Sequence, residues 1–223
     1  MYVTIQNDLS ENAVPVSAAK ARAHLPERCL KAGAYVYREG DAATYIYRVT
    51  SGVLRLTRLL EDGRRQVIAF GYPGDIVGFP NCGRHHTDCE ALSAATISPY
   101  RAAVLECGDG DPELHRQLLQ AALREISAMQ DHFMMLGRKT ASEKVASFLC
   151  TLSDRVGKPL GQFRQVVLPM SRLDIADFLG LTTETVSRTL TQLRKCKIIA
   201  VDNIHTVIIL RPDALLALAQ GSD

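Results

Sequence analysis

The chain has 223 residues, enough for one or two domains, with 22% charged residues and a formal net charge of +2. Hydrophobic residues make up 47% of the chain, an ordinary globular value that excludes a disordered or collagen-like protein. No apolar run approaches the length of a transmembrane helix, and residues 1–20 lack the pattern of a secretory signal. We therefore expect a cytoplasmic protein with no membrane partner.

The charge is unevenly distributed along the chain. Residues 1–137 carry 14 Lys and Arg against 16 Asp and Glu, whereas residues 138–223 carry 12 against 8. The basic C-terminal part mildly favours a polyanion such as nucleic acid. The 6 cysteines form no C-x-x-C pair, so in a cytosolic protein we expect reduced thiols rather than disulfides.

The patterning predicts an α+β chain in four segments. These are an N-terminal arm with a helical turn near residues 18–25, a β-roll, a long dimerisation helix and a C-terminal winged helix-turn-helix domain: residues 1–25, 26–109, 110–137 and 138–223.

The second segment is predicted to be a jelly roll or barrel, because short runs of β-branched and aromatic residues alternate with turn signals. The expected strands are residues 35–37, 45–49, 53–57 and 66–70. Ser51-Gly52 and Asp62-Gly63 are predicted to be hairpin turns, since Gly adopts a positive φ at no steric cost.

The third segment switches to a helical period, with Asp111 as a plausible cap and Pro112 at the first helical position. Apolar residues recur at spacings of three and four along one face: Leu119, Ala122, Ile126, Met129, Phe133 and Leu136. This stripe could pack on the chain's own β-roll. The alternative, which we favour, is pairing with the same helix of a second chain in a parallel two-fold homodimer.

The fourth segment has the spacing of a helix-turn-helix unit. Ser171 opens the first helix in a sequence that resembles a capping box, and Gly180 ends it in a left-handed turn. Ala176 lets the two helices approach, and Val186 packs between them. The β-hairpin expected within residues 198–210 forms the wing.

The second helix of this unit presents base-reading residue types at its N-terminal end: Thr183, Glu184, Ser187 and Arg188. Arg pairs bidentately with guanine, Glu accepts from cytosine N4, and Ser bonds several base edges. A surface ion pair between Glu184 and Arg188 at i,i+4 is the plainer alternative. Candidate contacts to the DNA backbone lie at the helix starts and the wing tip: Ser171, Thr182, Thr185 and His205.

The order of these segments resembles the Crp–Fnr superfamily of bacterial transcription regulators over residues 26–219. The most specific stretches are Pro73–Phe79, Leu136–Ala141 and Leu179–Arg188. Glu184-x-x-Ser187-Arg188 resembles the signature of the Fnr and FixK branches, which implies a TTGAT half-site in an inverted repeat of double-stranded DNA. The resemblance implies an activator that works with RNA polymerase. Regulators of the FixK-like branch are linked to nitrogen fixation or microoxic metabolism, so the resemblance implies such a role.

Ligand-binding relatives carry residues that this chain lacks. Where cyclic-nucleotide-binding relatives have Glu and an Arg-Ser pair, the resemblance places Phe79 and Asp88-Cys89. Where Fnr-type sensors have a central cluster-binding Cys, it places Ser98, and only Cys29 precedes residue 80. We therefore expect no cofactor and no dependence on cyclic AMP or an iron–sulfur cluster. A sensor gated by an unidentified small molecule in the β-roll is the alternative.

Neither an enzyme nor a metal site is predicted. The pair His85-His86 lacks the His-x-His spacing of a cupin iron site and is more typical of solvated loop histidines.

Cys196 is the candidate redox residue, because basic neighbours lower the pKa of a thiol. An idle thiol is the alternative, and Cys29, Cys82 and Cys89 are rivals for the most exposed thiol. Lys197 stands where relatives often have a C-capping Gly.

Overall fold

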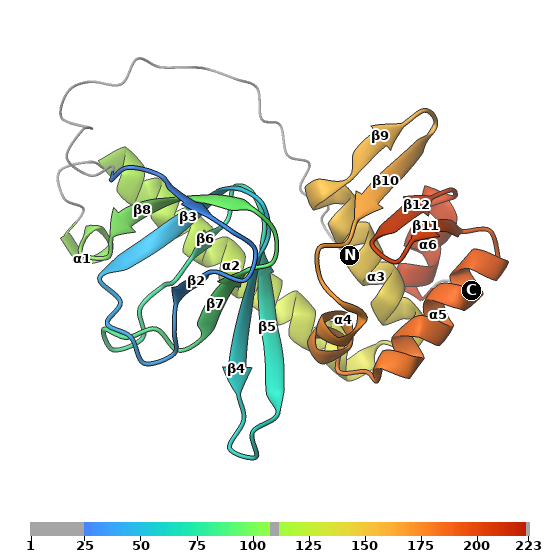
Figure 1. Ribbon diagram of the computed structural model, residues 1–223, viewed down its shortest axis with the longest axis horizontal. Helices are drawn as coiled ribbons and strands as arrows, with labels where there is room; N and C mark the ends of the chain where they lie inside the picture. The colour runs from blue at the N-terminus through green and yellow to red at the C-terminus, as the bar shows by residue number, and fades with distance from the viewer. Residues whose placement is uncertain (1–24, 108–111, 222–223) are drawn as a thin grey trace.

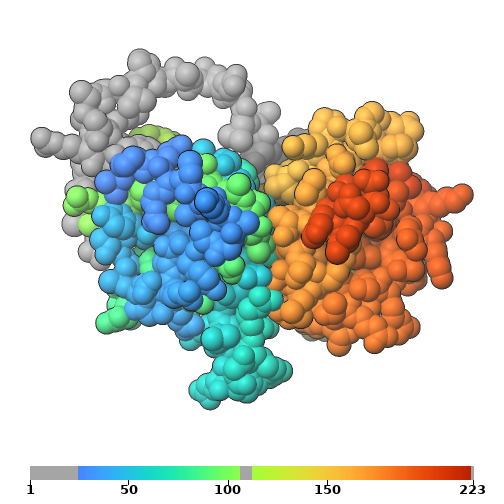
Figure 2. Space-filling view, in the orientation of Figure 1, coloured from blue at the N-terminus to red at the C-terminus, as the bar shows by residue number. Residues whose placement is uncertain are grey.

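The computed structural model describes residues 25–107 and 112–221, apart from the side chains of Glu106 and Cys107. A β-roll and a C-terminal helical domain lie side by side, and helix α2 (Pro112–Arg138) runs from one to the other (Figure 1). The space-filling view in Figure 2 shows the two domains in direct contact. The predicted cap Asp111, and the predicted helical turn apart from Leu25, lie outside the described residues.

The β-roll consists of two four-stranded sheets with strand orders β1-β8-β3-β6 and β2-β7-β4-β5. Its elements are β1 (Arg28–Leu30), β2 (Tyr35–Tyr37), β3 (Tyr45–Ser51), β4 (Leu54–Leu59), β5 (Arg65–Gly71), β6 (Ile76–Val77), β7 (Asp88–Ala91), β8 (Ala95–Arg101) and the short helix α1 (Val104–Cys107). Alternate side chains of both sheets meet in one core, where Val49, Leu54 and Ile97 are fully buried. The predicted strands are present, within one or two residues at their ends.

The two predicted hairpin turns have different outcomes. Asp62-Gly63 joins β4 to β5, which pair antiparallel, so this prediction is confirmed. The prediction for Ser51-Gly52 is wrong, because β3 pairs with β6 and β8 whereas β4 pairs with β5 and β7. This turn instead carries the chain from one sheet to the other. A Cβ on Gly52 would lie 2.4 Å from the carbonyl oxygen of Ala94, so the crossover requires glycine.

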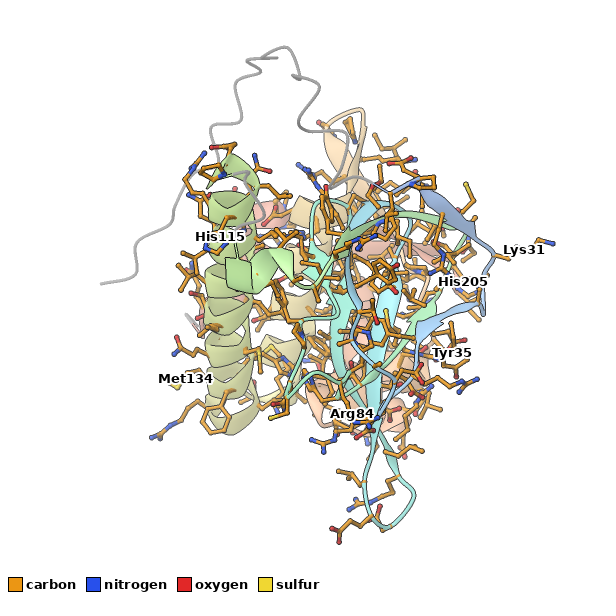
Figure 3. All side chains as sticks on the ribbon, turned by 90° about the vertical axis from the view of Figure 1, so that its left-hand side faces the viewer. Lys31, Tyr35, Arg84, His115, Met134 and His205 are labelled. Carbon is orange, nitrogen blue, oxygen red and sulfur yellow. The ribbon has the colours of Figure 1, made fainter. Side chains whose placement is uncertain are left out.

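Helix α2 packs on the β-roll through a face that the sequence analysis did not single out. Leu118 is buried there against Ile46, Tyr100 and Val104. The predicted stripe instead faces solvent in the single chain: Leu119, Ile126, Met129 and Phe133 are 53%, 51%, 55% and 75% exposed, while Ala122 and Leu136 are half-buried. Figure 3 shows Met134 projecting from α2 away from the strands. The alternative that the stripe covers the chain's own β-roll is therefore wrong for its exposed members.

The C-terminal domain packs helices on a four-stranded sheet of order β11-β12-β10-β9. Its elements are α3 (Ala141–Val156), β9 (Lys158–Leu160), β10 (Phe163–Val167), α4 (Arg172–Leu179), α5 (Thr183–Lys195), β11 (Ile199–Asn203), β12 (Thr206–Ile209) and α6 (Pro212–Gln220). Leu149, Leu152, Leu168 and Ile199 are fully buried in its core. None of the helices described in the structure is long and apolar enough to cross a membrane.

Candidate nucleic-acid interface

Helices α4 and α5 form the predicted helix-turn-helix unit. The hydroxyl of Ser171 accepts from the backbone N–H of Asp174 at 3.1 Å, and the Asp174 carboxylate accepts from the N–H of Ser171 at 2.9 Å. Gly180 ends α4 with φ +61°, and its N–H donates to the carbonyl of Ala176. The capping box and the left-handed glycine are therefore both present as predicted.

Helix α5 buries one face and exposes the other. Its buried face carries Val186, Leu190 and Leu193, which pack in the domain core. The hydroxyl of Thr182 caps the helix by accepting from the N–H of Thr185 at 3.1 Å. Because the cap and the buried face fix the rotation of the helix, the opposite face is presented to solvent as a rigid surface.

Three of the four predicted base-reading residues lie together on this exposed face, and the fourth, Thr183, is exposed in the first turn of α5. Glu184, Ser187 and Arg188 line a shallow hollow on the surface, whose other lining residues are Thr191, Gln192 and Lys195. The ion pair between Glu184 and Arg188 also forms, with Oε1 and Nη1 3.7 Å apart, but the side chains remain 78% and 80% exposed. Ion pairs this exposed contribute little to stability, so both groups remain accessible to a partner.

Two hydroxyls on α5 are already oriented by the helix backbone. Ser187 Oγ donates to the carbonyl of Thr183 at 2.9 Å, and Thr191 Oγ donates to the carbonyl of Ser187 at 2.9 Å. A hydroxyl that donates inward keeps its lone pairs free to accept. Ser187 is therefore oriented as an acceptor.

The candidate backbone contacts surround this face. Ser171 and Thr182 are exposed N-caps, and the hydroxyl of Thr185 lies 2.8 Å from that of Thr182. His205 is exposed at the tip of the β11–β12 hairpin, the predicted wing, where its N–H donates to Asn203 Oδ1 at 2.8 Å. The candidates therefore lie at the starts of α4 and α5 and at the tip of the wing.

Sequence reasoning missed two arginines between α5 and the wing. Arg172 and Arg194 line a second hollow together with Ser187, Leu190, Thr191 and Val201. Arg172 Nη2 donates to the carbonyl of Ile204 at 3.3 Å, and burial lowers the pKa of Arg172. The sequence did contain a signal for them, because a basic residue stands in the predicted first turn of α4 and another in the last turn of α5.

Cys196 caps the C-terminal end of α5 and is exposed, as are Cys29 and Cys82. Cys89 is not a rival, because it is fully buried and burial raises its pKa to about 12. Lys197 follows the end of α5 and adopts the left-handed conformation, with φ +56°. This is the conformation of a C-capping glycine, the residue expected at this position in relatives.

Aromatic rings fill the space beside Gly78 inside the β-roll. His85 stacks on Tyr37 with ring centroids 3.7 Å apart, and Tyr37 stacks on Tyr47 at 5.9 Å. A Cβ on Gly78 would lie 3.0 Å from the Tyr37 ring and 3.2 Å from the His85 ring. The expectation that both loop histidines are solvated is wrong, since His85 is 3% exposed and only His86 faces water.

Two further β-roll residues singled out in the sequence have partners within the chain. Asp88 Oδ1 accepts from the N–H of Glu39 at 2.7 Å, and the Ser98 hydroxyl donates to Glu27 Oε1 at 2.9 Å. Over the residues that the structure describes, no group of three His, Cys, Asp or Glu side chains is placed to hold a metal ion.

Comparison with known proteins matches both domains. Residues 27–105 match the cyclic nucleotide-binding domain family, and residues 143–218 match the Crp-like helix-turn-helix domain family. The chain is 43% identical to the nitrogen fixation regulation protein FixK of Bradyrhizobium diazoefficiens, over 88% of this chain and 83% of that protein. It is 40% identical to the protein of the same name from Rhizobium meliloti, over 84% of each chain. The solved structure of FixK2 from Bradyrhizobium japonicum superposes with a TM-score of 0.78 at 36% identity, covering 86% of this chain and 96% of that one.

Proposed function

Since this chain belongs to the Crp–Fnr family of transcription regulators and resembles its FixK members, we propose that it is a DNA-binding activator of transcription. It binds an inverted repeat with TTGAT-type half-sites as a homodimer and acts on RNA polymerase. The family consists of regulators rather than enzymes, in agreement with the sequence analysis.

One observation carries the DNA-binding part of this proposal, namely the exposed face of α5 with Glu184, Ser187 and Arg188. Side chains of these types match the donor and acceptor pattern of base edges in the major groove. Groups that can bind phosphate are also available. Arg172 and Arg194 line a hollow with Ser187 of α5, and the other candidates lie at the helix starts and the wing tip: Ser171, Thr182, Thr185 and His205. The homodimer is supported by the exposed stripe on α2, because a regulator that reads an inverted repeat needs two-fold symmetry.

Independence of cyclic nucleotides is proposed from the interior of the β-roll. The Tyr37, Tyr47 and His85 rings pack against Gly78, and a carboxylate rather than a guanidinium stands at Asp88. These residues do not fit a nucleotide phosphate, which requires positive charge or free amides. They also do not fit an iron–sulfur cluster, because Ser98 is held by Glu27 and offers no thiolate.

Selection of bound sequences from random DNA, using the protein as purified and without additives, tests this function. We expect an inverted repeat with TTGAT-type half-sites. Recovery of unrelated sequences, or no enrichment at all, contradicts the proposal.

Residues 27–105 match the cyclic nucleotide-binding domain family, and this match supports one alternative function. In that alternative, a small molecule bound in the β-roll controls DNA binding. Enrichment that appears only after cyclic AMP or another small ligand is added would favour that alternative.

A further inference from the structure

Four charged side chains join the β-roll to the first helix of the helix-turn-helix unit. Arg55 Nη1 on β4 lies 2.6 Å from Asp174 Oδ1 on α4, and Arg65 Nη2 on β5 lies 2.7 Å from the same oxygen. Arg65 Nη2 also lies 2.9 Å from Asp177 Oδ2. We refer to Arg55, Arg65, Asp174 and Asp177 as the interdomain ion cluster.

The part of the cluster formed by Arg55 and Asp174 is shielded from water, whereas Arg65 and Asp177 are 30% and 20% exposed. The side chains of Asp174 and Arg55 are 5% and 13% exposed. Glu90, directly opposite Arg55 on β7, binds Arg55 Nη2 at 2.5 Å. Burial alone lowers the pKa of Arg55, but Asp174 and Glu90 outweigh it and the pKa is raised. Hydrogen bonds to charged groups in a dry setting are short and directional, so this cluster resists rotation of α4 on the sheet.

The contact between the domains also includes an ion pair of Arg155 on α3 with Asp75 and a hydrogen bond from Gln66 Nε2 to the carbonyl of Asp177. Aromatic packing adds to these polar contacts. Phe178 on α4 packs against Phe70 on β5 and Phe148 on α3, with ring centroids 5.2 Å and 5.8 Å apart. His132 on α2 stacks on the same Phe178 ring at 4.1 Å. Apolar packing holds the domains together, and it constrains their angle less sharply than hydrogen bonds between charged groups, because the hydrophobic effect depends on area rather than direction. Among the directional contacts, the pair of Arg55 with Asp174 is less exposed than that of Arg155 with Asp75, at 13% and 5% against 40% and 30%, so the ion cluster is the better placed to set an orientation.

Asp174 links this orientation to the DNA-reading surface. The same carboxylate that accepts from both arginines also accepts from the N–H of Ser171, the N-cap of α4 and a candidate DNA contact. Helix α5 is fixed to α4 through the Gly180 turn, so a rotation of α4 carries the recognition face with it. In a dimer, the same rotation in both chains changes the distance between the two recognition faces.

We propose that Arg55 and Arg65 are positioning residues: their pairs with Asp174 and Asp177 fix the angle of the helix-turn-helix unit on the β-roll, and thereby the spacing of half-sites that the dimer accepts. This inference rests on the proposed function, since spacing has a meaning only for a protein that reads an inverted repeat.

The test measures binding to a set of operators that share both half-sites and differ only in the length of the spacer. The full-length wild type is compared with Arg55→Gln, Arg65→Gln and Asp177→Asn, with fluorescence anisotropy at one salt concentration. Arg58→Gln is the matched control, because Arg58 lies on the same strand β4 but pairs with Glu39 in an exposed contact. Circular dichroism and thermal unfolding establish that each variant is folded.

We expect wild type and Arg58→Gln to prefer one spacer. Arg55→Gln and Arg65→Gln should reduce that preference by about fivefold or more. Discrimination between correct and mutated half-sites should stay at the wild-type level. The Asp177 carboxylate acts through Arg65, whereas Arg65 also binds Asp174. Asp177→Asn should therefore have the smaller effect, and its combination with Arg65→Gln should have little more effect than Arg65→Gln alone.

Two outcomes separate the inference from the function on which it rests. If wild type shows no preference for any inverted repeat, the proposed function itself fails. If wild type prefers one spacer and the Arg55 and Arg65 variants keep that preference, including when their affinity falls equally for all spacers, the positioning role is overturned.

Discussion

At the scale of single residues, the exposed side chains of α5 differ in the kind of DNA contact open to them. Arg188 lines the first hollow with Glu184 and Ser187, whereas Arg194 lines the second hollow with Val201 of the wing. A guanidinium in the first hollow can meet base edges, and one in the second hollow can meet phosphates. This difference separates sequence specificity from general affinity.

Arg188→Ala is expected to weaken operator binding by about 1–3 kcal/mol and to relax discrimination at one guanine, because a bidentate contact is lost. Binding titrations against the operator and its single-base variants measure both effects. Arg194→Ala is the comparison, which should weaken all sequences alike and reduce the salt dependence. Equal weakening by Arg188→Ala on every sequence would make Arg188 a phosphate contact.

Peroxide is expected to weaken operator binding through Cys196, whose exposed side chain ends α5 among basic residues. A sulfenic or sulfinic group there adds bulk and negative charge near phosphate. The measurement is operator affinity before and after peroxide in wild type and in Cys196→Ser, with Cys82→Ser as an exposed-thiol control. Equal loss in wild type and Cys196→Ser, or no loss in wild type, excludes Cys196 as a redox switch.

Acid is expected to destabilise the β-roll through His85. Burial lowers the pKa of His85 from its usual 6.5, with Asp41 raising it and His86 lowering it to smaller extents. The folded chain therefore resists protonation at a pH where the unfolded chain accepts it. The stability due to neutral His85 is complete above about pH 6.5 and is lost as the pH falls towards the lowered folded value.

Urea titrations between pH 5 and pH 8, an interval of about 1.5 units on either side of the usual histidine value, measure this loss. His85→Phe keeps a ring on Tyr37 and should flatten the dependence, whereas the exposed His86→Gln should not. Burial also lowers the pKa of His132, so part of the slope should remain in His85→Phe. An unchanged slope in His85→Phe contradicts the assignment.

At the scale of elements, a helix or strand could be predicted where the interactions that form it are between residues close together in the sequence. The helix-turn-helix unit was predictable because Ser171, Gly180 and Thr182 act on atoms within a few residues of themselves. Strand β7 was not, because Asp88, Glu90 and Ala91 are residue types that are depleted in strands, although their burial alternates as in a strand.

The exposed stripe on α2 predicts the effect of one substitution. Ile126→Glu is expected to convert the dimer to a monomer, because it places an unpaired carboxylate in the interface twice across the two-fold axis. Sedimentation measures the oligomeric state, and operator binding should collapse with it. Ala128→Glu adds the same charge to an exposed position outside the stripe and should remain dimeric. A dimeric Ile126→Glu would place the interface elsewhere.

At the scale of the whole molecule, the contacts that a single sequence could not reveal are the ones between domains. Arg55 and Asp174 are 119 positions apart, and no local pattern relates them. The prediction of a hairpin at Ser51-Gly52 was wrong for the same reason. Strands β3 and β4 join different sheets, and the sheet that a strand joins depends on partners distant in the sequence. The exposed face of α5 could be predicted because it lies within one helix, whereas its base-reading role stays a prediction.

The filled β-roll predicts that cyclic AMP has no effect on the intact protein. Operator affinity should stay within about twofold across a cyclic AMP titration, because the aromatic rings packed around Gly78 and the Asp88 carboxylate do not fit a nucleotide phosphate. Isothermal calorimetry on the protein alone provides an independent measurement. Measurable heat of binding together with tighter DNA binding would contradict the prediction and favour the ligand-gated alternative.

The packing of α4 against β5 also limits how this regulator can be recombined with others. Residues 143–218 match a DNA-binding domain on their own, which invites transplantation onto a different β-roll. The grafted domain would, however, present Asp174 and Phe178 to a surface without Arg55, Arg65 and Phe70. The Asp174 carboxylate would then be buried without its arginine partners, and the Phe178 ring would lack the aromatic ring on which it packs. A working hybrid must therefore carry β4 and β5 along with the helices, so the unit of exchange is larger than the DNA-binding domain.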